Sequence, residues 1–133
     1  MTTGKTLILT MCITGLLPLV SAQSAPPRIT SADAKSHSGE TATVCGKVVD
    51  TKISKYALAG RGKPVNFDLD QPEPNPVFFF VTFGSQAGSN PEEAQAAYQG
   101  KSVCVTGKIA VVAAVPYIMA ADRSQIKIHA EDK

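Results

Sequence analysis

Apolar and polar residues alternate along residues 41–49 and again along residues 102–112. A period of two predicts strands that bury one face. Each segment also has a central glycine, Gly46 or Gly107, between β-branched residues, and a glycine inside a strand marks a bend or a bulge. The positions expected to face the core are Ala42, Val44, Val48, Val103, Val105 and Ile109.

Further extended segments are expected at residues 65–69, 77–83, 117–120 and 125–129. Residues 77–83 have the strongest strand composition, since they are rich in aromatic and β-branched side chains. One parity of this segment holds Val77, Phe79, Val81 and Phe83, and the other holds Phe78, Phe80 and Thr82. Both sets are apolar enough to be buried, so the pattern leaves open which set faces the core.

A helix is expected to begin at Asn90-Pro91-Glu92-Glu93 and to end at Gly100. Asn is a good helix cap, proline suits the first turn, and acidic residues suit the positive end of the helix dipole. A shorter helical turn is expected after Thr30-Ser31-Ala32-Asp33 and ends at Gly39.

Three strands, a helix and two more strands follow one another in this reading. That order predicts an all-β fold, the five-stranded Greek-key OB barrel with a helix between strands three and four. Strands one and four are antiparallel neighbours in this topology. Cys45 and Cys104 lie on those strands at the polar parity, so a disulfide is expected between them. Two unlinked thiols are the alternative.

The first 22 residues have the features of a secretory signal peptide. Lys5 precedes an apolar run, and Val20-Ser21-Ala22 offers a small-residue cleavage site. The run is shorter than the ~20 residues of a membrane-spanning helix, although a retained anchor is the alternative. Cleavage after Ala22 predicts a periplasmic or secreted protein without a stable membrane span. An even number of remaining cysteines, two, suits an oxidising compartment.

The mature chain is then divided into a flexible arm at residues 23–29, one OB domain at residues 30–129 and a polar tail at residues 130–133. The composition of 44% hydrophobic residues fits one soluble domain. The formal net charge of +2 excludes a strongly basic protein that encloses nucleic acid. We expect no enzyme, since no nucleophile, base and acid are grouped in the sequence. His37 and His129 have no metal-ligand spacing, and the two cysteines lack that of a redox pair, so no metal or cofactor is expected.

The segment from Thr51 to Lys63 is predicted to be a long loop. It contains four cations and a tyrosine and no acidic residue. Strand three offers an aromatic platform, and base–aromatic stacking contributes ~1–3 kcal/mol per base. These features predict weak binding of single-stranded nucleic acid by Lys52, Lys55, Tyr56, Arg61, Lys63 and Phe79.

The charge distribution also supports an alternative partner. Residues 64–100 contain no basic residue, and Asp68 and Asp70 lie on the second predicted strand, where a phosphate backbone would be repelled. The alternative is therefore a module that binds a protein or another envelope component. The oligomeric state is not predicted by any feature of the sequence.

Several motifs between Ile29 and Ile128 resemble those of a known family. They include Thr43-Val44-Cys45-Gly46-Lys47-Val48, Gly62-Lys63-Pro64, Gly100-Lys101-Ser102-Val103-Cys104-Val105-Thr106-Gly107-Lys108-Ile109 and Pro116-Tyr117-Ile118. In these motifs the chain resembles small secreted bacterial OB-fold proteins labelled as nucleic-acid-binding. The resemblance implies an OB fold outside the cytosol. Two positions depart from the family pattern: Phe83 stands in place of tryptophan, and residues 111–115 lack an aromatic and a glycine.

Overall fold

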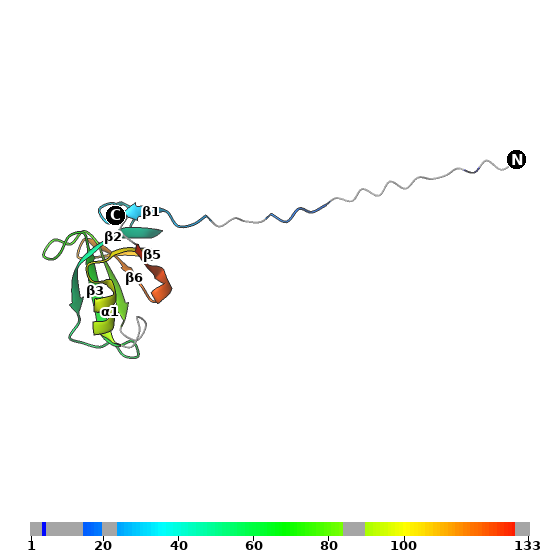
Figure 1. Ribbon diagram of the computed structural model, residues 1–133. Helices are drawn as coiled ribbons and strands as arrows, with labels where there is room; N and C mark the ends of the chain where they lie inside the picture. Colours follow the sequence, from blue (N-terminus) through cyan, green and yellow to red (C-terminus); the bar gives the residue numbers. More distant parts are fainter. Residues whose placement is uncertain (1–3, 5–14, 20–23, 84–89, 130–133) are drawn as a thin grey trace.

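The computed structural model describes Gly4 and residues 15–19, 24–83 and 90–129. Most of the predicted signal peptide and the whole predicted tail, residues 130–133, lie outside the described residues. The elements are β1 (Arg28–Thr30), the 3-10 helix η1 (Ala34–His37), β2 (Thr41–Ile53), β3 (Pro64–Leu69), β4 (Phe79–Phe83), α1 (Pro91–Tyr98), β5 (Ser102–Val112), β6 (Val115–Met119), the 3-10 helix η2 (Arg123–Gln125) and β7 (Ile126–His129) (Figure 1). No helix within the described part has the length and apolar character needed to cross a membrane.

The strands form one seven-stranded sheet in the order β1-β2-β3-β4-β6-β5-β7, and β2 pairs with β5 as well. The strands β2, β3, β4, β6 and β5 therefore pair in a cycle, and α1 lies between β4 and β5 in the chain. The all-β prediction is confirmed. The described chain has seven strands instead of five, because β1 pairs in parallel with β2 and β7 pairs antiparallel with β5. Two residues of the predicted arm, Arg28 and Ile29, thus belong to β1.

Strand β2 is longer than predicted and changes its partner along its length. Its first half, from Thr41 to Lys47, pairs with β5, and its second half pairs with β3. The register shifts between Val48 and Asp50. Such a bulge adds one residue to the strand, so the positions that face the core have opposite parity before and after it. Lys52 was predicted to lie in a loop. It lies in β2, and the shift directs it away from the core although it shares its parity with the buried Val48.

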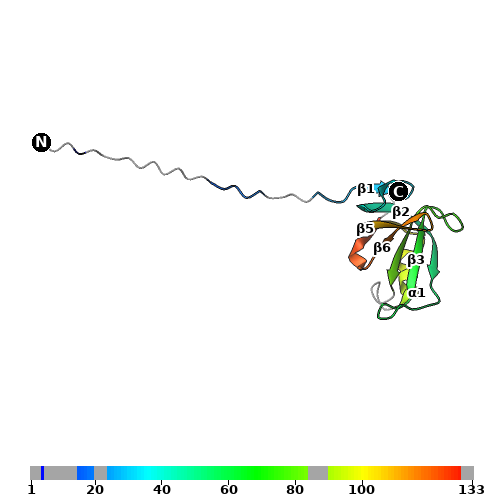
Figure 2. The same ribbon diagram turned by 180° about the vertical axis from the view of Figure 1, so that it is seen from behind.

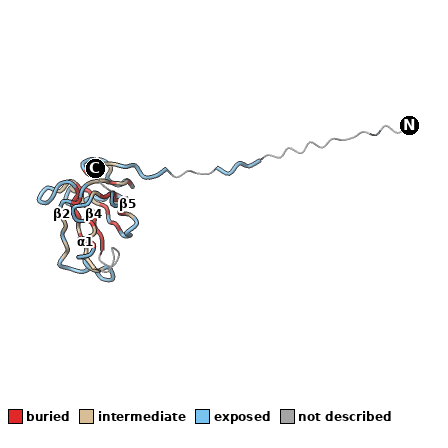
Figure 3. The backbone as a smooth tube through the Cα atoms, viewed as in Figure 1, coloured by how far each residue is buried: buried red, intermediate tan, exposed pale blue. Residues whose placement is uncertain are grey.

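The core resolves the ambiguity on β4. Phe78 and Phe80 are fully buried and belong to the core cluster, so the set that includes Thr82 faces inward. The buried residues of the chain gather within the sheet (Figure 3). The rings of Phe67 and Phe80 stack with centroids 4.7 Å apart. Tyr98 of α1 meets both rings edge-on, at 5.5 Å and 6.1 Å.

Helix α1 begins as the sequence predicts. The Asn90 side chain accepts a hydrogen bond of 2.8 Å from the backbone N–H of Glu93, and Pro91 follows the cap. The helix is seen beside β3 from both sides of the molecule (Figures 1 and 2). Its buried residues, Ala94 and Tyr98, belong to the hydrophobic core formed with the strands.

The predicted disulfide between Cys45 and Cys104 is confirmed. The two residues are directly opposite in the register of β2 and β5, with their Cα atoms 4.1 Å apart. A hydrogen bond of 2.7 Å between the hydroxyls of Thr43 and Thr106 lies next to it on the same pair of strands. The disulfide is therefore part of a polar face of the sheet.

The two strand glycines are required by close approaches of other side chains. A Cβ atom on Gly46 would lie 2.5 Å from Oδ2 of Asp70, and one on Gly107 would lie 2.7 Å from Cγ2 of Ile118. The Asp70 carboxylate is held there by the backbone N–H of Lys47, at 2.9 Å, and by the hydroxyl of Ser31. The predicted bulge is present in β2, but it follows Gly46 instead of coinciding with it.

Candidate ligand-binding face

One side of the sheet faces away from the core and carries polar and aromatic groups. Across β2, β3, β4 and β6, the register aligns Lys52, Asn66, Val81 and Met119 in one row. The next row contains Asp50, Asp68, Phe79 and Tyr117. Since successive strand residues point to opposite faces, these rows lie on the face opposite the buried phenylalanines of β3 and β4.

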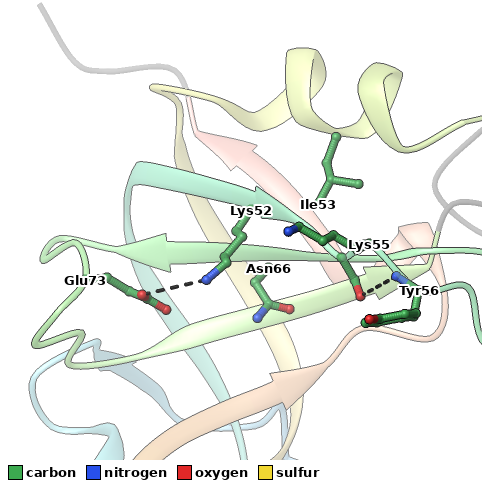
Figure 4. Close-up of a pocket in the computed structure, with 7 residues that line it drawn as sticks. Lys52, Ile53, Lys55, Tyr56, Asn66 and Glu73 are labelled. Carbon is green, nitrogen blue, oxygen red and sulfur yellow. Dashed lines mark hydrogen bonds and ion pairs between the residues drawn. The ribbon is translucent and has the colours of Figure 1, made fainter.

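Three of the predicted ligand-binding residues meet at one end of this face. Lys52, Lys55 and Tyr56 line a hollow of about 350 Å³ together with Ile53, Ser54, Asn66 and Glu73 (Figure 4). Tyr56 is 81% exposed, and its backbone N–H donates a 3.2 Å hydrogen bond to the Ser54 hydroxyl. This hydrogen bond fixes the turn that follows β2, next to the solvent-exposed ring of Tyr56.

A second hollow of about 350 Å³ adjoins the first, since both are lined by Asn66 and Glu73. It also contains the predicted platform residue Phe79. The remaining lining residues are Asp68, Pro74, Pro76, Val112, Ala113 and Val115. Together the two hollows form what we call the groove, which runs over β3 from the β2–β3 connection to the β5–β6 turn.

Phe79 is part of a preformed aromatic pair. Its ring stacks on that of Tyr117, with centroids 5.2 Å apart and an angle of 9° between the planes. Both side chains are half-buried. Stacked and offset rings are favourable arrangements that hold each other in place. Sequence reasoning did not select Tyr117, Asn66 or Glu73, and only the alternation along residues 115–119 could have placed Tyr117 on this face.

Two predicted residues do not line the groove. The Arg61 guanidinium lies over the ring of Phe83, 5.4 Å from its centroid, and so covers an aromatic side chain of β4. Lys63 is exposed just before β3 and is not among the residues that line either hollow. Both cations follow Tyr56 in the connection between β2 and β3, and their part in ligand binding stays a prediction.

The centre of the groove is acidic. Asp68 is 8% exposed, and burial raises its pKa from 3.8 to about 6, with further contributions from the charges of Asp50 and Glu73. A backbone hydrogen bond from Glu73 and the charge of Lys52 oppose the increase. Lys52 forms an ion pair with Glu73 at 3.9 Å, so part of its charge is neutralised within the groove.

We expect Asp68→Asn to stabilise the protein at neutral pH. The raised pKa means that the folded state binds the Asp68 proton more tightly than the unfolded chain does. The wild-type free energy of unfolding should therefore fall as the pH rises from about 4 to about 6. Asparagine removes the charge, and we expect a gain of about 1–2 kcal/mol at pH 7.5 after allowing for solvent screening.

Urea denaturation at a series of pH values measures this effect. The gain from Asp68→Asn should vanish near pH 4, and Asp50→Asn, which removes one repelling charge, should give a smaller gain at pH 7.5. A variant Asp68→Asn that is less stable than the wild type at pH 7.5 would contradict the interpretation.

Side chains of β2, β5 and β7 bring possible metal ligands together. Within residues 24–83 and 90–129, the donor atoms of Cys45, Cys104 and His129 lie within 4.8 Å of one another. Both sulfurs are bonded to each other in the disulfide, so they are not thiolate ligands in this state. His37, the other histidine, contacts the Glu40 carboxylate through Nδ1 at 2.6 Å.

Comparison with known proteins gives little further information. No family model matches the chain, and no curated protein matches it. Among solved structures, the chain is similar to the crystal structure of a putative nucleic acid-binding lipoprotein from Klebsiella pneumoniae subsp. pneumoniae MGH 78578, with 18% identity and a TM-score of 0.44. The match covers 75% of this chain and 79% of that chain. This similarity is too slight to assign the chain to a family.

Proposed function

We propose that the chain is an OB-type module that binds short single-stranded nucleic acid outside the cytosol. The cyclic pairing β2-β3-β4-β6-β5, with α1 between β4 and β5, supports this proposal because it is the strand order of an OB barrel. Strands β1 and β7 extend that ring at its edges.

The place of the groove is the observation that carries the proposal. Ligands of OB folds lie across the second and third strands, between the loops that follow the first and fourth strands. Here the groove lies over β3 and β4, and it is bounded by the β2–β3 connection and the β5–β6 turn.

The groups in the groove suit nucleotides. Tyr56 and the Phe79–Tyr117 pair offer flat rings for bases, and Asn66 offers an amide that can bind a base edge. Lys55 is exposed, and no ion pair is recorded for it within the described residues. Its ammonium group is therefore able to contact a phosphate.

The acidic centre limits how far a phosphate backbone can extend. Asp50, Asp68 and Glu73 would repel phosphates next to Phe79. The backbone should therefore follow the end of the groove that carries Lys55, with Lys63 outside the lining as a further cation and with bases directed toward the rings. Two or three phosphate contacts predict a slope of about −1.5 to −2 for the logarithm of affinity against the logarithm of salt concentration.

The disulfide supports a location in an oxidising compartment, since such bonds persist mainly outside the cytosol. The proposed route is export by the predicted signal peptide, residues 1–22, which stays a prediction. A periplasmic or a secreted location is compatible with both features.

Fluorescence anisotropy with a short labelled oligothymidylate tests the proposal. At about 20 mM salt we expect Tyr56→Ala and Lys55→Glu each to weaken binding by about tenfold, because one removes a stacking ring and the other repels a phosphate. Lys127→Glu is the matched control, since this exposed lysine of β7 makes the same change in charge and does not line either hollow.

The control should retain nearly all of the wild-type affinity. No binding at low salt would refute the proposed function, and an equal loss in Lys55→Glu and Lys127→Glu would show attraction by net charge alone.

One observation favours a protein partner as the second candidate. The hollow around Phe79 combines two prolines and two valines with the acidic Asp68 and Glu73. Apolar surface beside carboxylates suits a peptide segment with a basic side chain. Binding of such a peptide that is lost in Phe79→Ala, without oligonucleotide binding by the wild type, would select this candidate.

A further inference from the structure

The disulfide is contacted by an arginine that the candidate groove does not use. Arg28 of β1 donates from Nε to Sγ of Cys45 and from Nη2 to Sγ of Cys104, each at 3.1 Å. Its Nη2 also contacts Nε2 of His129 on β7. Side chains from β1, β2, β5 and β7 thus meet in one cluster, which we call the Arg28 cluster.

This arrangement favours the reduced form of the two cysteines over the oxidised form. A neutral disulfide sulfur is a weak acceptor and gains little from a guanidinium group. Two thiolates would gain much more, because hydrogen bonds between ionised partners are about twice as strong as neutral ones. Cations next to a cysteine also lower the pKa of its thiol. Lys127, which is opposite Cys104 in the register of β7 and β5, adds a further positive charge to this face.

The two sulfurs differ in their exposure to solvent. Cys104 is 3% exposed, whereas Cys45 is partly exposed. A thiol from solution would therefore reach Cys45 first. The leaving sulfur would then be that of Cys104, which is in contact with Nη2 of Arg28.

We propose that Cys45–Cys104 is a thiol-exchange site for low-molecular-weight thiols, with Arg28 stabilising the thiolates. The thiolate of a first small thiol attacks Sγ of Cys45, the S–S bond of the protein breaks, and Cys104 leaves as a thiolate. A second small thiol attacks the small-thiol sulfur of the mixed disulfide and releases Cys45 as a thiolate. In sum, the protein disulfide gains two electrons and becomes two thiolates, two small thiols become one small disulfide, and the two protons that those thiols lose go to the buffer.

His129 has a positioning part in this site. Its Nε2 contacts the same guanidinium nitrogen that reaches Cys104, so a neutral imidazole accepts a hydrogen bond from Arg28. This contact holds the end of the guanidinium group against the sulfurs. Arg28 is separated from the cysteines by 17 and 76 residues, so the spacing of the cysteines in the sequence gives no sign of the site.

Equilibration of the folded, full-length mature chain in buffers of reduced and oxidised glutathione tests the proposal. The fraction reduced is read by alkylation and mass measurement. We expect Arg28→Met to lower the equilibrium constant for reduction by about tenfold, equivalent to about 30 mV for this two-electron couple. Arg28→Lys keeps the charge but cannot reach both sulfurs in the same way, so it should recover part of the loss.

Two further measurements separate the contact of Arg28 with the sulfurs from the general positive charge of this face. Lys127→Met removes a neighbouring cation without a recorded contact to sulfur and should change the constant by less than about threefold. Thiolate absorbance of the reduced protein should titrate at a lower pH in the wild type than in Arg28→Met. Equal constants in wild type and Arg28→Met, or reduction of the wild type only in denaturant, would overturn the proposal.

Discussion

Replacing both Cys45 and Cys104 by alanine is expected to lower the free energy of unfolding by about 4 kcal/mol. The bond joins residues separated by 59 positions, so it removes much of the freedom of the unfolded chain. Alanine is preferred to serine at both positions. Cys104 is buried, and alanine adds no hydroxyl that would need a hydrogen-bond partner there. Urea denaturation of the oxidised wild type and the double variant measures the difference.

The wild type in the presence of a strong dithiol reductant is the matched control for this experiment. Its free energy of unfolding should fall by a similar amount, less the free energy by which Arg28 stabilises the thiolates of the folded protein. A loss of less than about 1 kcal/mol in the double variant would mean that the unfolded chain is already restricted by residual structure.

This stability difference is linked to the redox equilibrium of the Arg28 cluster. An interaction that makes the folded protein easier to reduce stabilises its reduced form. It must therefore decrease the difference in free energy of unfolding between the oxidised and the reduced protein. Arg28→Met should therefore widen that gap. The chain-entropy effect and the guanidinium effect oppose each other, so the folded protein can keep its disulfide and still exchange it.

The sequence predicts most of the strands because their faces alternate cleanly. The predicted strand at residues 102–112 has the same bounds as β5, and the start of α1 is fixed by Asn90 and Pro91, whose effects are local. The cysteine pairing could also be predicted from the sequence, because strand order and parity together placed both residues on one face. These features depend on neighbouring residues or on one topological rule.

The errors come from interactions between distant segments. Lys52 was assigned to a loop because the bulge between Val48 and Asp50 interrupts the alternation, and the bulge is defined by pairing with β3. Strand β1 is three residues long and has little pattern of its own, so it exists through its pairing with β2. Parity could not orient β4, since Val81 and Phe83 on its outer side are also buried.

The candidate groove was predicted only in part for the same reason. Lys55 and Tyr56 stand out in the sequence as a cation and an aromatic residue in a segment without acids. The roles of Asn66 and Tyr117 depend on the register of β3 with β4 and of β4 with β6. The pairing of Lys52 with Glu73 across the groove has no local signal in either segment.

Phe79 and Phe80 offer the second large and decisive prediction, since they are neighbours in β4 with opposite environments. Phe80→Ala should lower the free energy of unfolding by about 3–5 kcal/mol, because Phe80 is fully buried and stacks on Phe67 beneath Tyr98. Phe79→Ala should cost about 1–2 kcal/mol, since Phe79 is half-buried and its partner Tyr117 is still held in β6 by pairing with β5.

Oligonucleotide binding should show the opposite order of effects. Phe79→Ala should weaken it by about tenfold, because a stacking ring is lost from the groove. Phe80→Leu, a milder change that leaves the protein folded, should retain nearly all of the affinity. Denaturation curves and anisotropy titrations on the same samples separate the two quantities. If the larger stability loss came from Phe79, the outward row of β4 would belong to the core and the groove would have no aromatic platform.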